Sequence, residues 1–288
     1  MAMAPVISKK LKAPPKAKSP TVVSFVNLKG GVGKTAISVN FAAYCGKQGL
    51  KTLLIDLDPQ TNATFSCIPT DAWEKHAKDK GTVANLLGLR QHTSAEGKSK
   101  SAEDVIFKDV FENVDLIPSH LDLFTVDLDM GSETARETRL RRALKEISKS
   151  YDIIVCDCPP NLTIPTQNAL AISTHYVVPV SLDFLSSLGV ALLLGRVTKL
   201  SDDLENPIIH AGIVISRVGR KSYFRMQTAQ TLKKAFKDMI FDAQITERTA
   251  VAECAAKNIP IIESKDQSAI SEFDAFGAEL MEKLGLPT

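Results

Sequence analysis

No stretch of this 288-residue sequence approaches the roughly 18 consecutive apolar residues that a membrane-spanning helix needs. The N-terminal region also lacks the apolar core of a secretory signal peptide. Cysteine is scarce, with five residues, an odd number, and no CxxC pair or framework spacing. These absences exclude membrane-spanning and disulfide-stapled classes, so we expect a cytoplasmic protein with reduced thiols.

Two of the cysteines, Cys156 and Cys158, form the pattern "CDC". The pattern lies in an apolar run typical of a strand and has no partner ligands at zinc spacing. Buried thiols are therefore the favoured interpretation, and a metal site is the alternative.

Positive charge is concentrated at the N-terminus, although the net charge of the chain is only +2. Residues 1–20 contain five lysines, four prolines and no acidic residue. Such a segment cannot bury enough apolar surface to offset the entropy of ordering it, so we predict a disordered basic tail. It would serve as a solubilising leader or as a weak electrostatic tether to nucleic acid.

From Thr21 onward the chain has the composition of a globular protein, with 44% hydrophobic residues overall and short β-branched runs alternating with longer periodic segments. Predicted strands span residues 21–27, 51–58, 114–119, 151–157, 175–182, 208–216 and 239–245, and predicted helices include 33–47 and 138–149. Residues 66–113 are less regular and are interpreted as containing a surface loop or short insertion. The pattern predicts one α/β domain over residues 21–288, with a single doubly wound, mostly parallel sheet covered by helices on both faces.

A glycine-rich segment, "NLKGGVGKT", joins the first predicted strand to the first predicted helix. Glycines allow a tight turn whose N–H groups cradle phosphate, and the helix N-terminus adds a favourable dipole. Lys34 is expected to meet the β- and γ-phosphates, and the Thr35 hydroxyl to bind Mg²⁺. The predicted ATP-binding residues are Gly30, Gly31, Val32, Gly33, Lys34, Thr35 and Ala36.

Aspartates follow two further predicted strands. Asp157 ends the strand in "YDIIVCDCPP", and Asp56 and Asp58 end the strand in "LLIDLDPQTNAT". The carboxyl ends of parallel strands meet at one crevice, so these carboxylates are expected near the phosphates. The alternative is that they only make turn hydrogen bonds.

The motifs "KGGVGKT", "DLDPQTNAT" and "DCPP", in this order and at these separations, resemble the ParA/MinD group of deviant Walker ATPases. The resemblance covers nearly the whole chain after the tail, and the sequence is most similar to the short, Soj-like ParA partition ATPases. Two positions depart from the family pattern. Ala36 replaces the usual second threonine, which should be a mild change, and Thr61 replaces a common glycine, which could alter the loop carrying Asp58.

The resemblance implies roles for particular residues. Lys29 would reach across a two-fold axis to the partner's nucleotide, so that ATP holds a homodimer together. Lys29, Lys34 and Asp58 are the implied catalytic residues, with Asp58 orienting or deprotonating the attacking water. Thr35, Asp157 and Asp56 are the implied Mg²⁺ residues, with Asp56 supporting either the metal shell or the switch loop.

Other members of the superfamily fit the sequence less well. A MinD-type membrane cycle needs a cationic amphipathic C-terminal helix, whereas the polar face of the helix predicted here has four acidic residues against the single Lys283. Its apolar stripe could equally be core: Ile270, Phe273, Gly277, Leu280 and Leu284. Iron–sulfur relatives need a late CxxC or cysteines facing the dimer axis, and kinases of this fold have a tyrosine-rich tail. The chain shows neither pattern.

A basic region follows residue 211, where residues 211–260 hold nine basic and four acidic residues, a net charge of +5. In a helix over residues 222–238, an inner stripe of Phe224, Thr228, Leu232, Ala235 and Phe236 would leave three lysines on the outer face. The candidate DNA-binding residues are Arg217, Arg220, Lys221, Arg225, Lys233, Lys234, Lys237 and Arg248. A lysine-rich outer face is usually only solvated, so the ParA resemblance carries most of this prediction.

The predicted function is a nucleoid-associated ParA-like ATPase that segregates chromosome or plasmid DNA and is stimulated by a ParB-like partner. It would bind DNA non-specifically through phosphates, with no membrane association. One alternative is a positioning ATPase for a protein cargo, such as a chemoreceptor cluster or microcompartment. The other is a membrane-cycling MinD-type regulator.

Overall fold

The computed structural model describes residues 19–89, 100–131, 133–183, 186–219 and 222–287. Its strands form one eight-stranded sheet in the order β3-β4-β2-β5-β1-β6-β7-β8, and every pairing is parallel except that of β3 with β4. The strands are β1 Thr21–Phe25, β2 Thr52–Asp56, β3 Phe107–Phe111, β4 Val114–Ile117, β5 Ile153–Asp157, β6 His175–Ser181, β7 Ile209–Val218 and β8 Ile240–Thr246. The predicted α/β class and mostly parallel sheet are confirmed.

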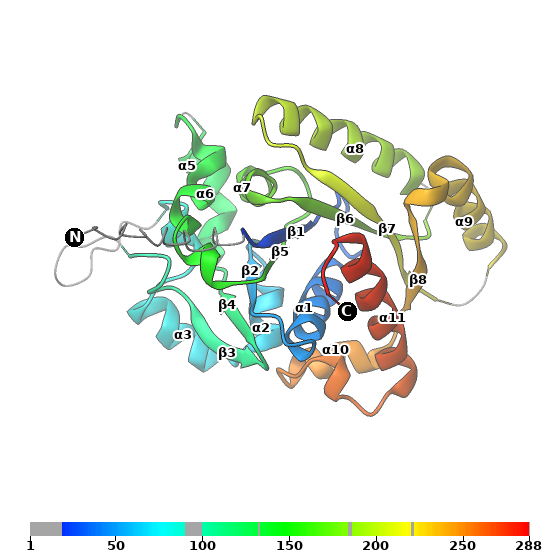
Figure 1. The fold of residues 1–288 in the computed structure, drawn as a ribbon, viewed down its shortest axis with the longest axis horizontal. Coiled ribbons are helices and arrows are strands. Elements are labelled where there is room, and N and C mark those ends of the chain that lie inside the picture. Colours follow the sequence, from blue (N-terminus) through cyan, green and yellow to red (C-terminus); the bar gives the residue numbers. More distant parts are fainter. Residues whose placement is uncertain (1–18, 90–99, 132, 184–185, 220–221, 288) are drawn as a thin grey trace, which may run out of the picture.

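Helices cover both faces of this sheet (Figure 1). They are α1 Lys34–Lys47, α2 Asn62–Cys67, α3 Thr70–Asp79, α4 Val83–Leu86, α5 Val126–Asp129, α6 Arg139–Leu144, α7 Ile164–Ile172, α8 Ser186–Asp203, α9 Tyr223–Phe236, α10 Thr249–Ala256 and α11 Gln267–Lys283. Short 3₁₀ helices span Leu121–Thr125, Arg136–Thr138, Ile147–Ser150, Lys237–Met239 and Ile261–Glu263.

The central strands are apolar on both sides because each face supplies a separate core. Along β5, Ile153 and Val155 pack towards α1 and α11, whereas Ile154 and Cys156 pack towards α6, α7 and α8. Every residue of β2 and β5 is buried, as expected for parallel strands covered twice. The five cysteines are free thiols and all are buried.

Helix α11 completes the core beside α1. Phe276 is fully buried against Phe25 and Phe41, with ring centroids 6.5 and 6.2 Å away. The apolar stripe predicted from the sequence is therefore core, with Phe273, Gly277, Leu280 and Leu284 buried and Ile270 half-buried. Among the described residues, no helix is both long and apolar enough to cross a membrane.

The region 66–113 contains more regular structure than the sequence predicted. It includes helices α3 and α4 and the antiparallel edge strand β3. The middle residues of β3, Lys108 and Asp109, are exposed, so the strand lacks the apolar alternation that would have identified it. The helix predicted over residues 138–149 is also shorter, because α6 ends at Leu144 and a 3₁₀ turn follows.

Candidate functional site

The carboxyl ends of β1, β2 and β5 lie next to one another, because the sheet pairs Phe25 and Asp56 with Asp157. The loop after β1 turns sharply into α1. Gly31 and Gly33 adopt φ angles of +72° and +82°, the left-handed region that glycine tolerates at little cost. The N–H groups at the start of α1 have no partners from earlier turns of the helix, which suits them to bind an anion.

Lysine side chains lie at both ends of this loop. Lys34 is buried, and its Nζ donates to the Lys29 carbonyl at 3.2 Å. Burial lowers the pKa of Lys34, against the opposing effect of Asp157 and Asp58. Lys29 is exposed, and its Nζ lies 2.6 Å from Oδ2 of Asp183 in the same chain.

A cavity of about 710 Å³ opens at this loop. The phosphate loop and Asp58 line one part, and the ends of β7 and β8, with Arg217 and Glu247, line another. The cavity is of the size that ligand sites commonly have. Its apolar part is lined by Ile37, Val39, Phe65, Ile245, Val251 and Ile259.

Asp157 is the most unusual group at the site. It is fully buried, and neither carboxylate oxygen has a hydrogen-bond partner among the described residues. Burial raises its pKa to about 6, although the Thr35 hydroxyl, which lies near without making a hydrogen bond, and the charge of the Lys34 ammonium oppose that shift. A buried carboxylate without partners is costly unless it is paired or binds a metal. Carboxylate and hydroxyl oxygens suit Mg²⁺, so Asp157 and Thr35 fit a magnesium site.

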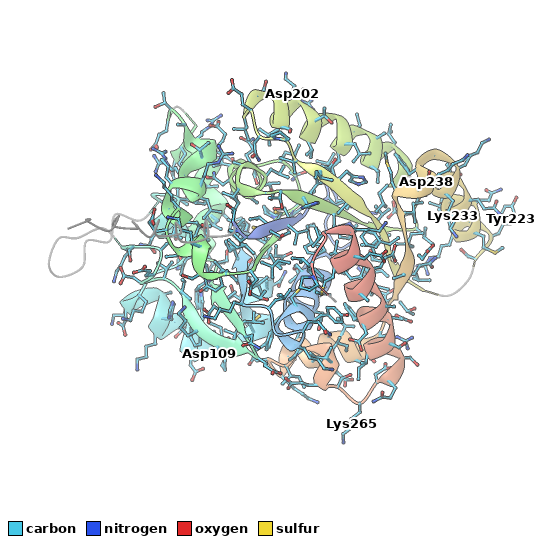
Figure 2. All side chains as sticks on the ribbon, viewed as in Figure 1. Asp109, Asp202, Tyr223, Lys233, Asp238 and Lys265 are labelled. Carbon is cyan, nitrogen blue, oxygen red and sulfur yellow. The ribbon has the colours of Figure 1, made fainter. Side chains whose placement is uncertain are left out.

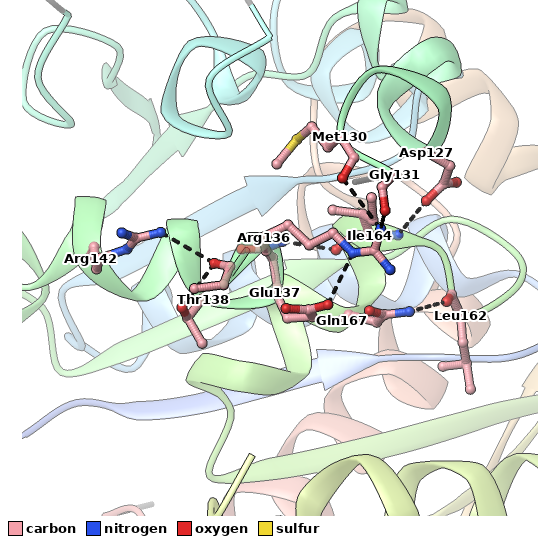
Figure 3. A network of polar contacts seen from close by, with 12 residues as sticks. Asp127, Met130, Gly131, Arg136, Glu137, Thr138, Arg142, Leu162, Ile164 and Gln167 are labelled. Atoms are coloured by element: carbon pink, nitrogen blue, oxygen red, sulfur yellow. Dashed lines mark hydrogen bonds and ion pairs between the residues drawn. The ribbon is translucent and has the colours of Figure 1, made fainter. Parts of the chain in front are cut away.

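The segment after Asp157 is fixed by contacts from α5 and the turn before α6 (Figure 3). The N–H of Ile164, the first residue of α7, donates to Asp127 Oδ1 at 2.9 Å. Arg136 donates to the Met130 and Gly131 carbonyls, and Gln167 donates to the Leu162 carbonyl at 2.9 Å. The Ile164 and Gln167 bonds hold the turn between β5 and α7, whereas the Arg136 bonds tie the end of α5 to the turn before α6.

Asp56 and Asp58 have different environments. Both Asp56 oxygens accept hydrogen bonds, from the Asp58 N–H at 3.1 Å and from the Thr64 N–H and hydroxyl at 2.8 and 2.7 Å. Burial, and then the charge of Asp157, raise the pKa of Asp56. These contacts favour the role in which Asp56 supports the switch loop, the loop that carries Asp58. The role of Asp56 in binding the metal stays a prediction. Asp58 lines the cavity and accepts from the Gln60 N–H at 2.9 Å.

Thr61, the residue expected to alter this loop, has a φ of +56°. A left-handed conformation costs a β-branched residue on the order of 1–2 kcal/mol, which explains why glycine suits this position. The Thr61 hydroxyl donates to the Gln60 carbonyl at 2.7 Å.

The predicted DNA-binding residues separate into two groups. Arg217 and Arg248 line the cavity and pair with acidic side chains, Arg217 with Glu247 and Arg248 with Glu272. Lys233, Lys234 and Lys237 are exposed on and just after α9, at the outer edge of the molecule, where Figure 2 labels Lys233. Arg225 is half-buried near the start of α9, and Arg220 and Lys221 lie outside the described residues.

Helix α9 contacts α8 through a narrower stripe than the sequence predicted. Leu232 is buried, and Thr228 and Phe236 are half-buried. Phe224 and Ala235 are exposed, so their assignment to the inner stripe was wrong. The reason is that α9 lies near the end of the sheet (Figure 1), where α8 is the α-helix that it contacts most among the described residues.

Sequence reasoning missed two residues that fix the phosphate loop. Asn27 accepts from the Lys29 N–H at 2.9 Å and donates to the Pro179 carbonyl at 2.6 Å. The Ser216 hydroxyl donates to the Val32 carbonyl at 2.6 Å. Asn27 directly precedes the motif and could have been noticed, whereas Ser216 has no local sequence signal.

The fold and the site together define a P-loop nucleotide-binding protein of the α/β class. The family model described as "AAA domain" matches residues 20–210. The chromosome-partitioning ATPase Soj of Treponema pallidum is 30% identical over 90% of this chain and 93% of that protein. The cell division protein PomZ of Myxococcus xanthus is 32% identical, over 82% of this chain and 70% of PomZ.

A solved structure of a plasmid partition protein from Borrelia burgdorferi superposes with a TM-score of 0.72. It is 23% identical and covers 92% of this chain and all of that one. The chain therefore belongs to this AAA-domain family and to the ParA/MinD superfamily of ATPases, near the Soj-like ParA proteins.

Proposed function

We propose that this chain is a partition ATPase that dimerises on ATP, binds DNA non-specifically and is stimulated by a ParB-like partner. Nucleotide binding is supported above all by the Asp157 carboxylate, which is buried beside the phosphate loop. It has no hydrogen-bond partner among the described residues. Thr35 and Asp157 would hold Mg²⁺, which neutralises phosphate charge when bound. The relatives support the partition role by their names.

The described side chains suit a phosphoryl transfer to water. Lys34, held close to the loop by the Lys29 carbonyl, would neutralise the β- and γ-phosphates. Asp58 would orient the attacking water from the cavity wall. Lys29 is exposed, so in a dimer it could leave Asp183 and reach a partner's nucleotide. An exposed ion pair contributes at most about 1 kcal/mol and would not prevent this movement.

Non-specific DNA binding would use the outer face of α9. Three exposed lysines contribute three phosphate contacts per protomer and six per dimer. Counterion release then predicts a log–log salt slope of about −2.7 for a monomer and about −5.4 for a dimer. ATP-dependent dimerisation would therefore switch DNA affinity without any element that reads bases.

Co-sedimentation with DNA across a salt series, with ATP and without nucleotide, tests this function. The triple variant Lys233→Ala, Lys234→Ala, Lys237→Ala should lose most ATP-dependent pelleting. The matched control is Lys75→Ala, Lys78→Ala, Lys80→Ala, which removes the same charge from exposed positions on and after α3, far from α9 (Figure 1). Equal loss in both variants would reject α9 as the DNA surface.

A second candidate is a positioning ATPase for a protein cargo. The name of PomZ, a cell division protein, favours it. Such a protein would show the same ATP-dependent DNA binding, but its activating partner would be bound to the protein cargo and not to a DNA site. ATPase stimulation by partners encoded near the gene would separate the two.

The membrane-cycling alternative makes a different prediction. The apolar stripe of α11 is used in the core, so that helix has little apolar surface to offer a bilayer. Pelleting with anionic vesicles but not with DNA, in the presence of ATP, would replace the partition proposal with this alternative.

A further inference from the structure

Two consecutive residues at the end of β7 contact two consecutive carbonyls of the phosphate loop. The Ser216 hydroxyl donates to the Val32 carbonyl at 2.6 Å, and Arg217 Nη1 donates to the Gly31 carbonyl at 2.7 Å. The Ser216 bond is buried, whereas the guanidinium is about half exposed. β7 is separated from β1 by β6 in the sheet, so these bonds brace the loop from two strands away.

These bonds also set the direction of the loop N–H groups. In a trans peptide the N–H points opposite to the carbonyl of the same plane. The bond from Arg217 therefore fixes the N–H of Val32, and the bond from Ser216 fixes the N–H of Gly33. N–H groups of a glycine-rich loop are the groups that cradle phosphate. Their orientation would otherwise be poorly fixed, because glycine allows many backbone conformations.

Arg217 is itself held in place by the neighbouring strand. Its Nε donates to Glu247 Oε1 at 3.0 Å, and Nη2 contacts the same oxygen. The Glu247 N–H donates to the Val218 carbonyl at 3.1 Å, which ties the end of β8 to the end of β7. The hydrogen bond from Arg217 lowers the pKa of Glu247, so the carboxylate is charged at neutral pH. Arg217 has a φ of +50°, an unfavourable conformation that the structure retains here.

We propose that Arg217 is a positioning residue for the phosphate loop and that Glu247 fixes the orientation of its guanidinium. This inference rests on the proposed nucleotide function and reassigns Arg217, which the sequence placed among the DNA contacts. The planar fork of arginine can reach Gly31 and Glu247 at the same time, which a lysine ammonium cannot do with the same geometry. Nucleotide affinity therefore depends on a contact between residues 186 positions apart.

Titration with a fluorescent ATP analogue and steady-state ATPase kinetics test the inference. Arg217→Ala should raise both the Kd and the KM for nucleotide about tenfold, while kcat at saturating ATP changes less than twofold. Glu247→Gln keeps the shape of the acceptor but loses its charge, so it should raise Kd two- to threefold. Arg217→Lys should recover only part of the affinity.

The matched control is Arg196→Ala, which removes the same charge from an exposed position on α8. It should bind nucleotide like the wild type. If Arg217→Ala unfolds, the Glu247→Gln and Arg217→Lys variants test the same inference, because each changes the contact between Arg217 and Glu247 and retains a side chain of similar size.

Four outcomes would overturn the inference. The first is wild-type nucleotide affinity in Arg217→Ala or, should that variant unfold, in both Glu247→Gln and Arg217→Lys. The second is a fall in kcat with KM unchanged, which would indicate a direct role in chemistry. The third is loss of DNA binding by Arg217→Ala at saturating ATP, which would restore the DNA assignment. The fourth is a wild type that binds no nucleotide, which would reject both this inference and the proposed function. The first three outcomes would reject the inference and leave the proposed function unchanged.

Discussion

Replacing Asp157 with asparagine should stabilise the nucleotide-free chain at pH 8. The carboxylate is fully buried at the end of β5, and its oxygens have no hydrogen-bond partner within the described part of the chain. Burial raises its pKa from an ordinary 3.8 to about 6, even with the Lys34 ammonium nearby. Asparagine has nearly the same shape and no charge, so it removes the cost of the buried anion.

The sign of the effect follows from proton linkage. The folded-state pKa lies above the unfolded value, so the folded chain binds this proton more tightly. The stabilisation is complete below about pH 4 and is lost as the pH rises through about 6. A shift from 3.8 to about 6 corresponds to about 3 kcal/mol in the free energy of unfolding. With a typical urea dependence, Asp157→Asn should raise the urea midpoint at pH 8 by about 1 M.

Urea denaturation followed by circular dichroism, at pH 5 to 8, measures this directly. The control is Asp109→Asn, an exposed position labelled in Figure 2, which should leave the midpoint nearly unchanged. Adding ATP and Mg²⁺ should raise the wild-type midpoint more than that of Asp157→Asn, because the variant loses a metal ligand. A lower midpoint for Asp157→Asn than for wild type at pH 8, without nucleotide, would refute the reasoning.

Three other predictions concern the dimer, the chemistry and the packing. Lys29→Ala should keep ATP binding and the folded state but lose the ATP-dependent dimer; an unchanged dimer by light scattering would exclude the trans role. Asp58→Ala should bind ATP and dimerise but lose hydrolysis, and phosphate release at the wild-type rate would contradict that role. Gly46→Ala should lower the free energy of unfolding by about 1–3 kcal/mol, since its Cβ would lie 2.0 Å from the Glu112 carbonyl oxygen. A Cβ added at Gly195 on α8 would meet open space, so Gly195→Ala should instead raise the free energy of unfolding by about 0.5–1 kcal/mol. Urea midpoints equal to that of the wild type in both variants would refute both predictions.

The strand, loop and helix of the nucleotide site could be predicted because their signals are local. "GGVGKT" follows an apolar run directly, and Asp157 and Asp56 end apolar runs of their own. Parallel strands place their carboxyl ends at one edge, so the sequence could also predict that these residues meet. It could not predict that both oxygens of Asp56 are occupied by Thr64 and Asp58, while those of Asp157 lack a partner among the described residues.

The edge of the fold was harder to predict than its centre. β3 is half exposed and its apolar residues have no clear period, and most of α9 is exposed or half-buried, so the composition of these segments says little about which residues are buried. The central strands are covered on both faces, and their continuous apolar runs identified them without any tertiary knowledge.

The amino-acid sequence by itself determined the phosphate loop, the aspartates at the strand ends and the order of the parallel strands along the chain, because each depends on residues within about one helical turn or one strand. Only the tertiary structure decided where the arginines act. Arg217 lies in a basic stretch that the ParA resemblance assigned to DNA binding, yet the position of β7 brings its guanidinium to Gly31, 186 residues earlier in the chain. A side chain's contacts depend on which strand ends come together in space, and charge along the sequence does not contain that information.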